Sequence, residues 1–331
     1  MKKTIIAAVI VLTVGIIGLM ITVVSAGNPF NTVETNKQSK VPMEGIQHIA
    51  VSGADVDIVL NEQESSEEIK VALKGKMNKS IQDKYKMKVK KNGDTLDVSI
   101  ENHSFQFFVI NSSYLEILLP SEVYQSVTAT TSSGDITSNG ITANKISFKS
   151  SSGDISTKNN KIEEIYVVES SSGDILSVND QSQQATLTSS SGDVSTSALD
   201  SLNTEVASQS GDIFLKKGSG NLLLKSSSGD IHVKGDPEGI KVESKSGDIS
   251  IESVELKDNV DISSSSGDVS LHYSKKPKSF KLTYQGNSGD GIVLLKGVKY
   301  DVKSENALSG QIGGGKHLIK VKTESGDFVL Q

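Results

Sequence analysis

The 331-residue sequence contains no cysteine and no tryptophan, and aromatic residues make up only 5% of it. Without cysteine, the chain has no disulfide, no thiolate metal site, no cysteine nucleophile and no cysteine for attaching a lipid. Arginine is also absent, so all 34 basic residues are lysine, and the formal net charge is −6. Nucleic acid is therefore not an expected partner, because phosphate recognition needs a basic face and usually the fork of arginine.

The first residues carry a targeting signal. Lys2 and Lys3 precede an uncharged run from Thr4 to Val24. A spanning helix needs about 20 residues, whereas the apolar region of a signal peptide has about 7–15. We therefore predict that residues 1–26 form an uncleaved transmembrane helix, with the N-terminus cytoplasmic and the rest extracytoplasmic. The alternative is a secreted protein cleaved after Ala26.

Two regions precede the repeats. Residues 27–45 are polar, contain Pro29 and Pro42, and are predicted to be a linker without regular structure. Residues 46–125 show short alternating strands, among them a hairpin in which Tyr85–Val89 faces Leu96–Ile100 around Asn92-Gly93. This second region lacks the repeat described below, so we predict a β-rich head that caps the repeats.

Ten copies of the tripeptide Ser-Gly-Asp occupy the rest of the chain at a nearly constant spacing. Their glycines are Gly134, Gly153, Gly173, Gly192, Gly211, Gly229, Gly247, Gly267, Gly289 and Gly326. From Gly134 to Gly289 eight intervals span 155 residues, a mean of about 19 per interval. A fixed period of this length predicts a solenoid, in which each repeat buries its apolar face only against its neighbours.

Alternation within each repeat predicts strands. Counted from the glycine, positions −7, −5 and +2 are mostly apolar, −3 is small, −1 is always serine, and the positions between them are mixed and often polar. The fold class is therefore all-β: a parallel β-solenoid over residues 126–331, about 19 residues per coil, or rung. Rungs about 4.8 Å apart give a rod of roughly 50 Å. A degenerate eleventh copy is predicted near Ser309–Ile312.

The end of the chain is predicted to be the end of the stack. Phe328–Leu330 would then form an unpaired apolar strand that docks a partner or a second copy. The alternative is that the loop at residues 297–318 covers it.

The segment Ile117-Leu-Leu-Pro120, the Ser-Ser-Gly-Asp-Ile repeats that follow it, and the terminal segment from Gly313 to Asp327 carry a family resemblance. They resemble the bacterial putative-adhesin β-strand-repeat family, which includes the LiaG-like membrane-anchored envelope proteins. The resemblance implies a non-enzymatic protein that faces the cell envelope and has a role in envelope stress. It supplies no catalytic residues.

The aspartates of the repeats are the main candidates for chemistry. They are Asp135, Asp154, Asp174, Asp193, Asp212, Asp230, Asp248, Asp268, Asp290 and Asp327. Stacked in register they form a ladder of carboxylates, which favours either a weak Ca²⁺ ladder or hydrogen bonds from turn N–H groups. One aspartate per rung supplies few oxygens for an ion, so the hydrogen-bond alternative is favoured and no metal site is assigned.

Catalysis is not expected. The serines at −3 and −1 are interpreted as small residues between converging sheets, joined by Ser–Ser hydrogen bonds. The five histidines (His48, His103, His232, His272 and His317) do not recur at one repeat position, so no base is placed for a serine nucleophile. We expect no catalytic residues, no cofactor, and an adhesin-like protein that binds cell-wall glycan or an envelope protein. A polysaccharide-cleaving β-helix enzyme and a Ca²⁺-binding β-roll are the alternatives.

Overall fold

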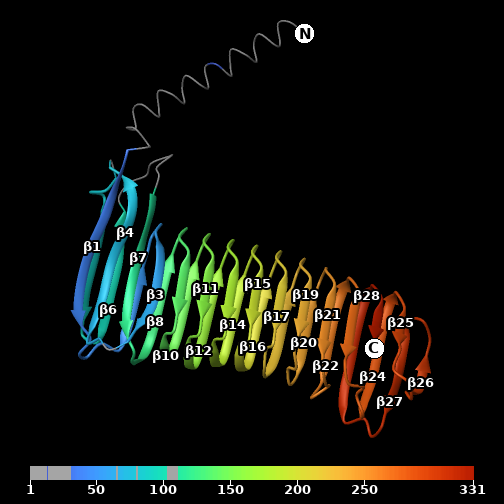
Figure 1. The fold of residues 1–331 in the computed structure, drawn as a ribbon. Coiled ribbons are helices and arrows are strands. Elements are labelled where there is room, and N and C mark those ends of the chain that lie inside the picture. The colour runs from blue at the N-terminus through green and yellow to red at the C-terminus, as the bar shows by residue number, and fades with distance from the viewer. Residues whose placement is uncertain (1–12, 14–30, 65, 80, 103–110) are drawn as a thin grey trace, which may run out of the picture.

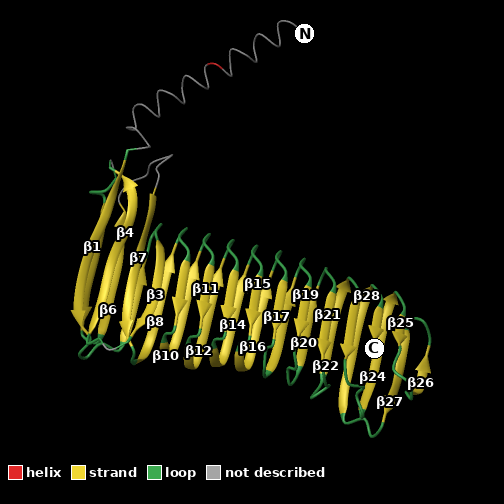
Figure 2. Ribbon diagram, viewed as in Figure 1, coloured by secondary structure: helices red, strands yellow, loops and turns green. Residues whose placement is uncertain are grey.

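The computed structural model describes residue 13 and residues 31–64, 66–79, 81–102 and 111–331. In Figures 1 and 2 these residues form a long stack of strands, with the N-terminal strands at one end and the C-terminal strands at the other. The strands belong to two sheets, one of 14 strands (sheet A) and one of 15 (sheet B). The predicted membrane-spanning segment, residues 1–26, lies outside the described residues apart from Thr13. Among those described, no helix is long and apolar enough to cross a membrane.

Each repeat contributes one strand to each sheet, and the Ser-Gly-Asp corner joins the two. Strands at the same position of neighbouring rungs pair parallel and in register. This pairing confirms the predicted parallel β-solenoid. The pairs, with the strand of sheet B first, are β8 (Val123–Thr131) and β9 (Ile136–Asn139), β10 (Thr142–Ser150) and β11 (Ile155–Lys158), β12 (Lys161–Ser170) and β13 (Ile175–Val178), β14 (Gln181–Ser189) and β15 (Val194–Ser197), β16 (Asp200–Ser208) and β17 (Ile213–Lys216), β18 (Asn221–Ser226) and β19 (Ile231–Lys234), β20 (Ile240–Ser244) and β21 (Ile249–Ser253), and β22 (Val260–Ser266) and β23 (Val269–Tyr273).

The core lies between the two sheets and follows the predicted alternation. In the rung of β10 and β11, Ile146, Phe148 and Ile155 are all buried, and they occupy positions −7, −5 and +2. Because strand side chains alternate between faces, the residues between them point outward. The same three positions in neighbouring rungs form vertical files of mostly apolar, buried side chains.

At the C-terminal end the order of the rungs departs from the order of the sequence. β28 (His317–Ser325) pairs with β22 on one side and with β24 (Phe280–Ser288) on the other. Likewise β29 (Phe328–Leu330) lies between β23 and β25 (Gly291–Val293). The last repeat is therefore inserted between the two that precede it in the sequence, and in Figure 1 the C-terminus lies inside the stack.

Two predictions for this end are wrong. Phe328–Leu330 is not an unpaired terminal strand, since both of its edges are paired and Phe328 and Leu330 are fully buried. Nor is Ser309–Ile312 an eleventh copy of the repeat. It belongs to β27 (Ala307–Ile312), which runs antiparallel to β24 and carries the edge strand β26 (Lys299–Lys303). These two antiparallel strands close the end of sheet B.

The N-terminal end shows the same interleaving. β2 (His48–Ser52) and β3 (Asp57–Gln63) form a rung that lies between β8–β9 and a rung made of β6 (Thr95–Asn102) and β7 (Asn111–Pro120). Both sheets therefore run through the predicted boundary at residue 125. The predicted hairpin is confirmed, because β5 (Tyr85–Asn92) pairs antiparallel with β6, and Gly93 has the positive φ of 63° that the turn requires.

The prediction of an unstructured linker over residues 27–45 is wrong for most of its length. β1 (Thr32–Pro42) pairs antiparallel with β4 (Glu68–Asn78), and β4 pairs antiparallel with β7. β1 is the edge strand of sheet A, and Thr35 is its one buried residue. Because this strand buries only one side chain, its sequence can be polar throughout. A polar composition of this kind is also typical of a linker, which explains the wrong prediction.

Candidate binding surfaces

The aspartates of the repeats form one continuous ladder on the outer side of the corner. In each of ten links, the backbone N–H of one aspartate donates to Oδ1 of the aspartate in the neighbouring rung, at 2.8–2.9 Å. The ladder starts at Asp57, which the sequence analysis missed because Gly53 and Asp57 are separated by three residues. At its other end Asp327 lies between Asp268 and Asp290, as the interleaved rung order requires.

This arrangement gives every carboxylate of the ladder except that of Asp290, at its end, a backbone partner without a cation. A hydrogen bond from the N–H of a turn is also the ordinary role of aspartate at such a corner. Over the described part of the chain, no group of three or more acidic or histidine side chains is placed to hold a metal ion. The Ca²⁺ ladder stays a prediction.

The serines at position −3 are buried and bind backbone rather than one another. Ser150 Oγ accepts the N–H of Gly153 at 2.9 Å and donates to the carbonyl of Gly134, one rung away, at 3.2 Å. Equivalent bonds recur at Ser170, Ser189 and Ser208. The predicted Ser–Ser bonds between these positions are therefore wrong. So is the inward placement of position −1, where Ser152 is exposed.

One serine and one histidine do meet, outside the repeat positions that sequence reasoning considered. His48 Nδ1 and Ser126 Oγ are 2.7 Å apart across β2 and β8, and His48 Nε2 lies 3.9 Å from Asp94 Oδ2. The second distance is too long for a hydrogen bond, so Asp94 does not orient the ring as a catalytic triad requires. His48 and Ser126 also lie on the outward face of a sheet whose N–H groups are used in strand pairing. The pair therefore lacks both an orienting acid and donors for an oxyanion.

A buried carboxylate links two neighbouring rungs at the opposite corner. Asp180 is 0% exposed; its Oδ1 accepts the backbone N–H and the side-chain amide of Asn160, and its Oδ2 accepts the hydroxyls of Thr157 and Ser177, at 2.6–2.9 Å. Burial and the charge of Asp180 raise the pKa of the adjacent Tyr166 hydroxyl well above its ordinary value. All of these donors lie inside the stack, so the network is structural.

Sheet B carries a groove that crosses five rungs. It has a volume of about 520 Å³. Most of its lining is hydroxyl, amide or methyl, with Lys225, Glu243 and Lys245 as its charged residues. Two of these have partners next to the groove, since Lys225 pairs with Glu205 and Glu243 with Lys241, both at 2.7 Å. The groove is lined by Thr188, Ser189, Ser190, Ala207, Ser208, Gln209, Lys225, Ser226, Ser227, Glu243, Ser244, Lys245 and Ser263.

The outward face of sheet A carries an aromatic pair beside a shallow basic depression. The rings of Phe214 and His232, in neighbouring rungs, stack at 5.2 Å between centroids with an interplanar angle of 10°. Phe214 is still 38% exposed. Lys234, in the same strand as His232, pairs with Glu252 at 2.9 Å, and this hydrogen bond lowers the pKa of the Glu252 carboxyl. A depression of about 300 Å³ follows these residues and also includes Lys216 and His272.

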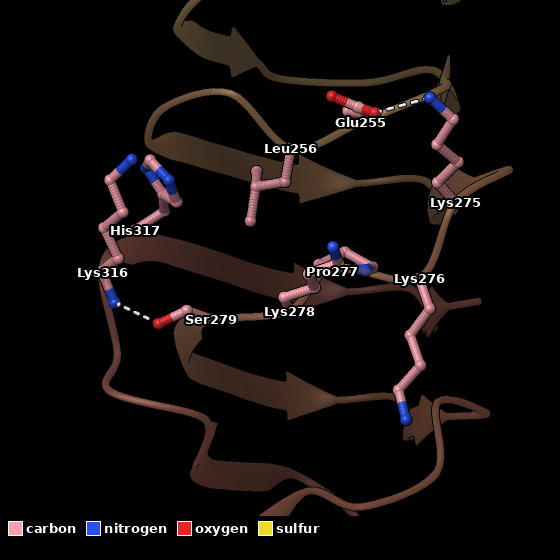
Figure 3. A pocket seen from close by; sticks show the side chains of 9 residues that line it. All are labelled: Glu255, Leu256, Lys275, Lys276, Pro277, Lys278, Ser279, Lys316 and His317. Atoms are coloured by element: carbon pink, nitrogen blue, oxygen red, sulfur yellow. Dashed lines mark hydrogen bonds and ion pairs between the residues drawn. The ribbon is translucent and has the colours of Figure 1, made fainter.

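A basic cleft of about 440 Å³ lies at the C-terminal end of the rod (Figure 3). Three segments far apart in the sequence build it: the loop after β21, the loop between β23 and β24, and the turn before β28. Its apolar part is Leu256 and Pro277, and its only acidic lining residue, Glu255, pairs with Lys275 at 2.6 Å. Four lysines and one histidine supply the rest of its charge: Lys275, Lys276, Lys278, Lys316 and His317. Sequence reasoning missed this cleft, although Lys275-Lys276-Pro277-Lys278 is a dense basic run.

Comparison with known proteins gives the following matches. A family model described as Toastrack DUF4097 matches residues 46–276 and, in a second overlapping match, residues 224–331. No protein with a curated description matches the chain. Among solved structures, a putative adhesin from Bacteroides fragilis NCTC 9343 is similar at 17% identity, with 70% of this chain and 97% of that chain covered and a TM-score of 0.43. Two proteins from Parabacteroides distasonis ATCC 8503, a putative adhesin and a putative lipid binding protein, are each similar at 12% identity. They cover 89% and 90% of this chain and 97% of their own length, and both have a TM-score of 0.43.

Proposed function

The chain belongs to the Toastrack DUF4097 family, and on that premise we propose that it is a non-catalytic, membrane-anchored binding protein of the bacterial cell envelope. The uncharged run from Thr4 to Val24 supports an anchor, and Lys2 and Lys3 before it favour an extracytoplasmic solenoid. The family resemblance adds a role in envelope stress to this proposal.

The observation that carries the proposal is the groove across five rungs of sheet B. The same backbone positions line it at successive rungs, about 4.8 Å apart, and the hydroxyl and amide groups that face it are those of Thr188, Ser190, Gln209, Ser227 and Ser263. Such a surface suits a linear ligand with repeated hydroxyl groups, such as a cell-wall glycan. Each contact is weak, but contacts held on one rigid rod add because later ones form at high effective concentration.

The same groove argues against the polysaccharide-cleaving alternative. Glycoside cleavage needs two carboxyl groups that flank the scissile bond. Glu243 is the one carboxylate lining the groove, and it is neutralised by Lys241. The groove therefore has groups that bind a sugar but no acid and base to cleave it.

A co-sedimentation assay tests the proposal. The full chain in detergent micelles is mixed with insoluble envelope fragments, and both the pellet and the sugar released into solution are measured. We expect saturable sedimentation without release of sugar. Ser190→Tyr with Ser227→Tyr places two rings in the groove and should weaken sedimentation, whereas Ser151→Tyr with Ser171→Tyr makes the same change at equivalent positions outside it. Release of soluble fragments, or equal binding by both variants, would contradict the proposal.

The location is tested separately. In intact cells that make the full chain, an added protease should digest the solenoid, as judged with an antibody against residues 126–331. Protection until the cells are lysed would contradict an extracytoplasmic solenoid.

A further inference from the structure

The basic cleft at the C-terminal end holds positive charges that the protein itself leaves uncompensated. Of its four lysines, Lys275 is paired with Glu255, and His317 lies 3.8 Å from Asp258. Over the described residues, the ammonium groups of Lys276, Lys278 and Lys316 have no acidic partner within 4.0 Å, and all three side chains are exposed. Concentrated, unpaired charge in a concave site is the usual setting for binding an ion of opposite sign.

We propose that this cleft binds a linear polyanion, a flexible polymer with regularly spaced phosphate or carboxylate groups. In Figure 3 Lys276 and Lys316 lie on opposite sides of the cleft, with Leu256 and Pro277 between them. Charges placed apart do not converge on one small anion, but they match successive charges along a chain. Where that chain has a carbon backbone, as a carboxylate polymer does, the backbone can contact the apolar part of the cleft.

The use of lysine alone also fits a flexible polymer. An ammonium group acts as a point charge without the bidentate geometry of arginine, so it favours charge density over one orientation of the anion. The net charge of −6 does not oppose such binding strongly, because charges beyond the Debye length of about 10 Å at 0.1 M salt are largely screened.

The position of the cleft favours a polymer over a lipid surface. The strands next to the segments that build the cleft, β21, β23, β24 and β28, lie toward the end of the rod opposite the N-terminal strands (Figure 1), roughly 50 Å from them at about 4.8 Å per rung. This step rests on the proposed function: if the N-terminus is anchored, the cleft lies at the end of the rod that is farther from the anchor.

The test is a binding titration of the full chain in detergent micelles with inorganic polyphosphate, and with polygalacturonate as the carboxylate probe. Lys276→Gln, Lys278→Gln and Lys316→Gln together should raise Kd about 100-fold at about 0.1 M salt, on the order of fivefold per charge. The control variant, Lys86→Gln with Lys90→Gln and Lys158→Gln, removes the same charge from exposed lysines elsewhere and should shift Kd by less than about twofold. Higher salt should weaken the wild type more than the cleft variant.

The outcomes separate this inference from the proposed function. Equal loss in both variants would show nonspecific attraction and overturn the inference, as would no polyphosphate or polygalacturonate binding by the wild type. Binding that depends on the cleft lysines but occurs only on vesicles containing phosphatidylglycerol would replace the polymer with a membrane. If the chain binds envelope fragments but neither polyanion, the proposed function stands and only the cleft assignment fails.

Discussion

The glycines of the corners are required by the contact between rungs, and Gly192→Ala tests this most sharply. A Cβ added at Gly192 would lie 2.2 Å from the carbonyl oxygen and 2.4 Å from the carbonyl carbon of Gly173 in the neighbouring rung. Both are backbone atoms, so no side chain can move aside. To reach an ordinary contact of about 3.4 Å, the two rungs must separate by about 1 Å at this corner.

The magnitude follows from the bonds that such a separation breaks. Several hydrogen bonds join these two corners. The N–H groups of Ser190 and Ser191 donate to the rung before at 3.3 and 3.1 Å, the N–H of Asp193 donates to Asp174 at 2.8 Å, and Ser189 Oγ donates to the Gly173 carbonyl at 3.1 Å. Losing two or three of them at about 1 kcal/mol each, with the strain of overpacking, gives about 3–5 kcal/mol. The matched control is Gly218→Ala, where an added Cβ meets nothing within 4 Å and φ is not positive.

The assay is urea unfolding of the full chain in detergent, followed by circular dichroism, with hydrogen exchange to locate the effect. Gly192→Ala should lower the unfolding midpoint and speed exchange in the rungs around Gly173 and Gly192, whereas Gly218→Ala should change stability by less than about 1 kcal/mol. If both variants unfold like the wild type, the rungs are not in such close contact at this corner.

Four further predictions follow from the side chains. Asp180→Ala should lower the free energy of unfolding by about 3–5 kcal/mol in urea titration, because several buried donors lose their acceptor, and Asp180→Asn should cost less; equal losses would argue against the network. Asp212→Asn keeps a side-chain oxygen for the N–H of Asp230 and should change the melting temperature little. Millimolar Ca²⁺ should leave the melting temperature of the wild type unchanged, and a clear rise would support the metal ladder. Desolvation raises the pKa of Asp236, but hydrogen bonds from Val254 and Ser253 outweigh it and hold the pKa below its ordinary value of 3.8. The ionised carboxylate therefore stabilises the fold above about pH 4, and this stabilisation is lost as the pH falls through the lowered pKa. Asp236→Asn should make the melting temperature fall less steeply with decreasing pH, and an unchanged pH dependence would contradict this. Phe328→Ala should destabilise the C-terminal rungs by about 3–5 kcal/mol in hydrogen exchange, whereas a frayed terminal strand would show no effect.

The period and the alternation within each repeat were enough to predict the rungs, the two sheets and most of the core. Ile146 and Phe148 face inward because period-two alternation leaves no other choice in a half-buried strand. The order of the rungs was not predictable in this way. Leu282 and Ile319 occupy the same repeat position with similar side chains, so the pattern allows either repeat to stack next to β22.

The candidate surfaces were less predictable because they depend on contacts between distant segments. Lys276 and Lys316 face one cleft only because β28 is inserted beside β22 and β24. Asp180 follows an asparagine in an apparently polar turn, and nothing in its local sequence indicates that it is fully buried. The repeat predicts that outward positions of sheet B recur at every rung, but it does not predict which of these positions line a groove.

The interleaved rung order supports both the architecture and the basic cleft, and one cross-linking measurement tests it directly. The chain has no cysteine, so introduced pairs report without background. Ser270 and Val329 are directly opposite on β23 and β29, whereas Ser270 and Ile292 are two strands apart. Under mild oxidation, Ser270→Cys with Val329→Cys should form an intramolecular disulfide, and Ser270→Cys with Ile292→Cys should not. The reverse result would place the last repeat at the end of the stack and contradict the account.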